Sequence, residues 1–118
     1  MEKNSVDLVK LAVKALDEKM AEDIKIIDIS EISPISDYFI IAGGNNTSHI
    51  QVLSDVVEEV LGRAGVNGIL KEGYESANWI LLDAGDIIIH IFDRENRSLY
   101  DLERLWRDGK SKDLSLFM

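Results

Sequence analysis

The segment NWILLDAGDIIIHIFD, residues 78–93, limits the possible folds of this chain more than any other stretch. Two apolar runs flank a short turn at residues 83–86, where Gly85 can adopt the positive φ that a tight turn requires. This pattern predicts a β-hairpin. The chain therefore contains a sheet, and the remaining segments decide its type.

Three further segments are predicted to be strands, because they are short, rich in apolar residues and bounded by turn residues: 23–29, 38–42 and 69–73. The segment 38–42, YFIIA, is almost entirely apolar, as expected of a central strand that is covered on both faces. Together with the hairpin, these segments give five strands.

Three segments have apolar residues at helical spacing. The first is residues 5–20 with Ser5 as N-cap, the second is residues 50–64 ended by Gly65, and the third begins at Asn96 or Ser98 and ends at Trp106. The predicted fold class is α/β: a single domain with a mixed five-stranded sheet layered with helices. Residues 1–107 form this domain, and residues 108–118 form a C-terminal tail in which Leu114, Leu116 and Phe117 can dock.

Composition excludes several classes of protein. The 118 residues include no cysteine and two histidines, which rules out disulfides and thiolate metal sites. No signal peptide or membrane-spanning run is present, so a cytoplasmic protein is expected. A net charge of −9 would repel nucleic acid and attract a basic partner protein.

The loop in DYFIIAGGNNTSHI, residues 37–50, resembles a phosphate-binding turn but carries no lysine or arginine. The simpler interpretation is that Gly43 and Gly44 make the turn. Thr47 or Ser48 then caps the following helix, and Gln51 completes a capping box with Ser48. We predict no bound cofactor.

Asp83 and Asp86 are the nearest pair of carboxylates that could hold magnesium for a nucleotidyl transfer. Aspartates beside a glycine turn are also ordinary turn residues, so no metal site is predicted. His90 alternates with apolar neighbours and is predicted to be a packed strand residue, whereas His49 is expected at the surface. Because no serine lies in a nucleophile setting, we predict no catalytic residues.

Several ordered motifs closely resemble the ribosomal silencing factor family, also called the Iojap family. They are DIKIIDISEISPISDYFIIAGGNNTSHI, the pair Glu72 and Gly73, WILLDAGDIIIHIF and RSLYDLERLW, and they span roughly residues 5–107. The loop departs slightly from the family pattern, which usually has Thr-Gly or a similar pair in place of Gly43 and Gly44.

The resemblance implies a non-enzymatic regulator of translation with a nucleotidyltransferase-like fold that lacks the catalytic carboxylates. Members of the family bind ribosomal protein number fourteen of the large ribosomal subunit, at the face that meets the small subunit. They block subunit association when nutrients run short, and they are often homodimers when free. No sequence-specific nucleic acid and no membrane are implied as partners.

The partner-binding residues are predicted from Trp79, which matches the family's tryptophan. Leu81 and Asp83 share its strand face by the two-residue period of a β-strand. Tyr74 and Glu75 lie just upstream and Tyr100 follows the hairpin, so these three are second choices. Trp79 and Trp106 can each be interface anchors or core residues.

Two alternative functions stay open at this stage. One is a nucleotide-binding transferase of the same fold, based on the AGGNNTS loop together with Asp83 and Asp86. The other is an acidic dimeric adaptor for a different basic protein.

Overall fold

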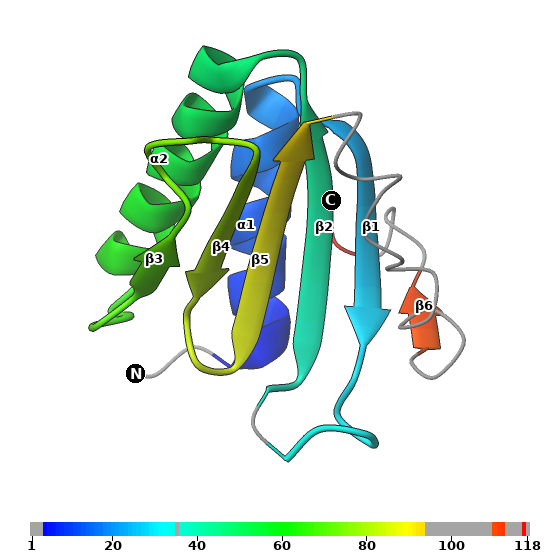
Figure 1. Cartoon of the computed structure of the whole chain (residues 1–118). Coiled ribbons are helices and arrows are strands. Elements are labelled where there is room, and N and C mark those ends of the chain that lie inside the picture. Colours follow the sequence, from blue (N-terminus) through cyan, green and yellow to red (C-terminus); the bar gives the residue numbers. More distant parts are fainter. Residues whose placement is uncertain (1–3, 35, 94–109, 113–116, 118) are drawn as a thin grey trace.

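The computed structural model describes residues 4–34, 36–93, 110–112 and 117. Within these residues the chain forms two helices and six strands (Figure 1). In chain order they are α1 (Ser5–Glu18), β1 (Glu22–Asp28), β2 (Tyr38–Gly44), α2 (Thr47–Arg63), β3 (Leu70–Glu72), β4 (Trp79–Asp83), β5 (Ile87–Asp93) and β6 (Lys110–Lys112).

The strands form one mixed sheet in the order β3-β4-β5-β2-β1-β6. The central pair, β2 with β5, is parallel, and every other pair is antiparallel. This confirms the predicted α/β class and mixed sheet, with all five predicted strands present in the predicted order. The short strand β6 adds a sixth that the sequence did not predict.

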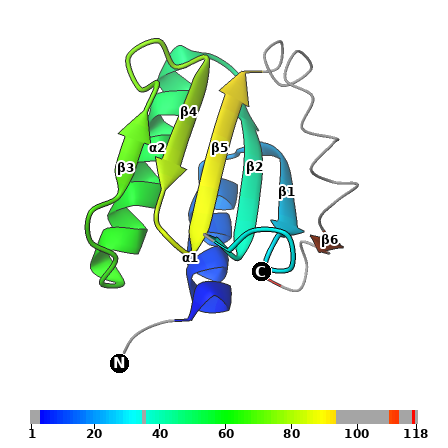
Figure 2. The same cartoon turned by 60° about the horizontal axis from the view of Figure 1, so that its bottom comes forward.

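Both helices lie on the same face of the sheet (Figures 1 and 2). The main hydrophobic core fills the space between them and the strands, and many of its side chains are fully buried, including Val13, Leu53, Ile40, Ile80 and Ile89. We call the opposite side of the sheet the helix-free face. It carries a second, smaller cluster of buried residues, namely Ile27, Ile29, Ile41 and Phe92.

The helix N-caps differ from the prediction. Asn4 caps α1 and Asn46 caps α2, because each asparagine Oδ1 accepts a hydrogen bond from the backbone N–H three residues later, at 2.9 Å from Asp7 and 2.8 Å from His49. Ser5 therefore lies inside the helix, and neither Thr47 nor Ser48 is the cap. The predicted capping box is wrong as well, since the Gln51 side chain donates to the Tyr74 carbonyl instead.

The glycines at 43 and 44 do not form a turn but end strand β2. Gly44 is required by close packing: a Cβ at this position would lie 2.6 Å from Cγ1 of Ile50 in α2. The predictions for Gly65 and Gly85 are confirmed. Gly65 follows the end of α2 with a φ of +99°, and Gly85 lies in the β4–β5 turn with a φ of +86°.

The predicted third helix and Trp106 lie outside the described residues. In the predicted tail, residues 110–112 pair with β1. Phe117 is 7% exposed, and its ring meets that of Tyr38 edge-on, with centroids 6.0 Å apart. The domain boundary at residue 107 and the likeness to nucleotidyltransferases stay predictions.

Candidate functional site

Strand β4 presents its odd-numbered residues to the helix-free face. Ile80 and Leu82 are fully buried in the main core, whereas Trp79, Leu81 and Asp83 point the other way and are partly exposed. The structure thus brings together the three residues that the sequence placed first.

Trp79 belongs to a group of four rings that we call the aromatic cluster: Phe39, Trp79, His90 and Phe92. The indole stacks on the Phe92 ring with centroids 5.1 Å apart and an interplanar angle of 24°. Phe39 meets the imidazole of His90 edge-on at 5.0 Å. The cluster is held by cross-strand neighbours, because Trp79 is paired with Phe92 and Leu81 with His90.

His90 is packed within the strand, as predicted, with only 6% of its surface exposed. Burial lowers its pKa from 6.5 to about 4, so the imidazole is neutral near pH 7. Its Nδ1 accepts a hydrogen bond of 3.1 Å from the indole Nε1–H of Trp79. This link was not predictable from the sequence, since it depends on strand register.

Further apolar side chains of the helix-free face lie in the row that crosses β4 at Asp83, at the other end of the strand from Trp79. One row across the sheet pairs Leu70 with Asp83, Asp83 with Ile88, Ile88 with Phe39 and Phe39 with Ile27. Leu70 is 64% exposed at the β3 edge, and Ile88 and Phe39 are partly exposed. The helix-free face therefore combines apolar side chains with carboxylates at the β3 and β4 side, Glu72 and Asp83.

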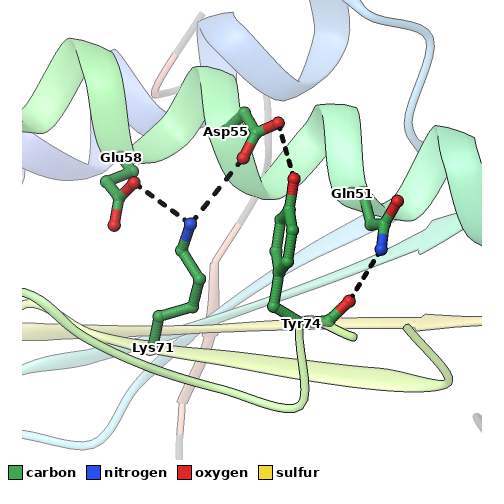
Figure 3. A network of polar contacts seen from close by, with 5 residues as sticks. All are labelled: Gln51, Asp55, Glu58, Lys71 and Tyr74. Carbon is green, nitrogen blue, oxygen red and sulfur yellow. Dashed lines mark hydrogen bonds and ion pairs between the residues drawn. The ribbon is translucent and has the colours of Figure 1, made fainter. Parts of the chain in front are cut away.

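The second-choice residues lie elsewhere. Tyr74 packs toward α2, where its hydroxyl donates to Asp55 Oδ2 at 3.0 Å and Gln51 donates to its carbonyl at 2.9 Å (Figure 3). The hydrogen bond to Asp55 is the main cause of the raised pKa of Tyr74. Glu75 is exposed in the loop before β4, and Tyr100 lies outside the described residues.

Lys71 completes this group on the helix side of the sheet. Its ammonium lies 3.1 Å from Glu58 and 3.7 Å from Asp55, and 4.4 Å from the centre of the Tyr74 ring (Figure 3). These contacts tie the edge strand β3 and the following loop to α2. We expect them to fix the backbone that leads into Trp79 rather than to form a second binding surface.

The same loop is packed closely against the start of β4. Gly73 has a φ of +80°, and a Cβ there would collide with the Trp79 carbonyl oxygen. Ala77 is buried at a φ of +52°, and its N–H donates to the Gly73 carbonyl at 2.9 Å. The loop at residues 73–77 therefore packs directly against the backbone of Trp79.

The loop between β2 and α2 is held in place by hydrogen bonds of His49, which lies in the first turn of α2. The Nδ1 of His49 accepts from the Asn45 N–H at 2.9 Å, and its Nε2 lies 2.7 Å from the Lys19 carbonyl.

At the hairpin, Asp83 Oδ1 accepts a hydrogen bond from the Gly85 N–H at 3.0 Å, as aspartates in turns commonly do. In the described part of the chain, no three His, Cys, Asp or Glu side chains are grouped so that they could hold a metal ion.

No helix among the described residues is both long enough and apolar enough to cross a membrane.

The model of a family described as "ribosomal silencing factor during starvation" matches residues 2–117 of the chain.

Three known proteins illustrate the similarity. The ribosomal silencing factor of Bacillus subtilis is 36% identical over 115 residues, which cover 98% of each chain. A crystal structure of a protein from Chromobacterium violaceum superposes with a TM-score of 0.84 at 34% identity, over 92% of this chain and 90% of the other. A mouse protein named for mitochondrial assembly of the large ribosomal subunit is 27% identical over 83% of this chain and 44% of its own length.

Proposed function

Since the chain belongs to the ribosomal silencing factor family, we propose that it binds the large ribosomal subunit and prevents the small subunit from joining. The family consists of silencing factors, which are regulators of translation rather than enzymes. The proposed contact on the ribosome is protein number fourteen of the large subunit, and the proposed outcome is repression of translation when nutrients are scarce.

The observation that best supports this proposal is the helix-free face around Trp79. It presents a partly exposed tryptophan, and Leu81, Ile88 and Phe39 are partly exposed on the same face of the sheet, together with the carboxylate of Asp83. Large aromatic anchors surrounded by apolar and polar contacts are typical of protein interfaces. Trp79, Leu81 and Asp83 are accordingly the proposed first contacts.

The charge of the chain also favours this type of partner. Ribosomal proteins are generally basic because they bind RNA, and the −9 charge of this chain would attract such a surface. The mouse relative, named for large-subunit assembly, supports the choice of subunit. We further propose a cytoplasmic location and a homodimer in the absence of the ribosome.

Two measurements with purified components test the function. The protein should co-sediment with isolated large subunits, and light scattering should show less association of the two subunits when the protein is added. If it pelleted with neither subunit at low salt, the proposal would be abandoned.

Replacing the anchor locates the contact. Trp79→Ala should weaken binding to the large subunit by about 2 kcal/mol or more, because truncating a tryptophan that is buried at an interface commonly costs this much. Val52→Ala is the matched control, since Val52 is an exposed apolar residue of α2 on the other side of the sheet. Equal affinities for the two variants, measured with folded proteins, would move the interface away from β4.

A further inference from the structure

The hydrogen bond between Trp79 and His90 connects the proposed anchor to a buried side chain. The indole Nε1 donates to His90 Nδ1 at 3.1 Å, and the two rings lie 6.0 Å apart. An indole N–H can only donate, so Nδ1 must be the unprotonated nitrogen of the imidazole. The proton of the neutral ring is therefore on Nε2.

We propose that His90 is a positioning residue for the docking surface, holding the indole of Trp79 in the orientation that the partner meets. This inference rests on the proposed function and deepens it, because it identifies a residue that acts on the partner through Trp79. His90 itself, at 6% exposure, offers little surface to a partner.

Two contacts at different points of the indole fix its position. Stacking on Phe92 at 5.1 Å restricts the tilt of the ring plane, and the bond from Nε1 restricts rotation within that plane. Phe92 and His90 belong to the same strand, and both are buried. The rigid strand β5 thus sets the direction of a partly exposed side chain on β4.

Only some residue types could hold the indole in this way. Leucine or phenylalanine at position 90 would fill the space between Phe39 and Phe92 but would leave the Trp79 N–H without this acceptor. A neutral imidazole supplies an acceptor inside an apolar cluster without adding a charge.

The other imidazole nitrogen supports a role beyond packing. His90 Nε2 is buried and has no hydrogen-bond partner, one of two such side-chain atoms identified in the described part of the chain. An unsatisfied buried N–H lowers stability, so packing alone does not explain a histidine at this site. Its acceptor for Trp79 accounts for its presence.

The first test uses the free protein and does not depend on the ribosome. Exchange of the Trp79 indole proton, followed by NMR, should be slow in the native protein and faster in His90→Leu. His90→Asn should restore slow exchange, because the asparagine Oδ1 lies the same number of bonds from Cβ as Nδ1. Ile89→Val, on the helix side of the same strand, controls for a general loss of stability.

The second test measures binding to isolated large subunits. His90→Leu should bind about fivefold more weakly, the effect of one neutral hydrogen bond, whereas His90→Asn should stay within about twofold of the native protein. In a Trp79→Phe background, which lacks the indole N–H, His90→Leu should cause no further loss. A loss of the same size in that background would overturn the proposal, because His90 would then act without Trp79.

The two tests separate failure of this inference from failure of the proposed function. If the native protein did not bind large subunits, the proposed function would fail, and the indole exchange rates alone would decide the role of His90. If His90→Leu left the exchange rate of the Trp79 indole unchanged, the positioning role would be refuted even with ribosome binding intact.

Discussion

At position 90 the chain places an ionisable side chain in the middle of an apolar cluster. The folded protein holds His90 neutral, since burial lowers its pKa to about 4, whereas in the unfolded chain the value is 6.5. Between these two pH values the unfolded chain binds a proton that the folded protein does not bind. The free energy of unfolding therefore falls as the pH drops from 6.5 to about 4. Above pH 6.5 His90 is neutral in both states, and the stability of the folded protein no longer depends on its titration.

This difference gives a prediction for stability. The native protein should lose about 3 kcal/mol more than His90→Asn between about pH 7 and about pH 4, because asparagine does not titrate. Urea unfolding of both proteins at several pH values measures the difference, in which the carboxylates common to both cancel. Parallel stability curves for the two proteins would contradict the predicted neutral, buried imidazole.

At the scale of the elements, the N-terminus of α2 depends on a single side chain. Asn46 precedes the helix in an extended conformation and accepts the His49 N–H, while Thr47 and Ser48 are already helical and exposed. The sequence offered several adjacent residues that can cap a helix, and only the backbone conformation distinguishes them.

Removal of this cap should have a measurable cost. Asn46→Ala should lower the free energy of unfolding by about 1 kcal/mol, whereas Ser48→Ala should change it by less than about 0.5 kcal/mol. Chemical denaturation of the two variants provides the comparison. A larger loss for Ser48→Ala would show that the serine is the cap.

The types of the elements were predictable because periodicity repeats over many residues. The five strands and the two described helices follow from apolar spacing, and the shared face of Trp79, Leu81 and Asp83 follows from the two-residue period of β4. The neighbours of Trp79 were not predictable in this way. Phe92 and His90 reach it through cross-strand register, which depends on how separate segments align.

Loop residues gave the weakest predictions for a similar reason. Tyr74 is close to Trp79 in sequence, but a loop has no period that assigns its side chains to a face. Its contacts with Asp55 and Gln51 place it on the helix side of the sheet. Its role in partner binding stays a prediction, as do those of Glu75 and Tyr100.

At the scale of the whole molecule, net charge should govern how fast the partner is found. An excess of nine negative charges produces a field that extends beyond individual contacts and is screened by salt. Steering of this kind changes the association rate more than the dissociation rate.

The association rate constant with large subunits should therefore fall by about tenfold or more when salt rises from about 50 mM to about 500 mM. Stopped-flow mixing measures it. Asp83→Asn, which keeps the acceptor for the Gly85 N–H, should slow association more than Asp17→Asn, since Asp17 lies on α1 away from the helix-free face. A rate constant independent of salt would argue against a basic docking surface.

The parallel pairing of β2 with β5 has a consequence for how the protein is made. Tyr38 pairs with Ile87, so the middle of the sheet joins positions 49 residues apart in the chain. Contacts of such long sequence separation form slowly, and during synthesis they must wait for the later strand. A nascent chain that ends before Ile87 has no strand to link β4 to β2, and Trp79 cannot meet Phe92. The surface proposed to silence ribosomes is therefore completed only after the ribosome has synthesised most of the chain.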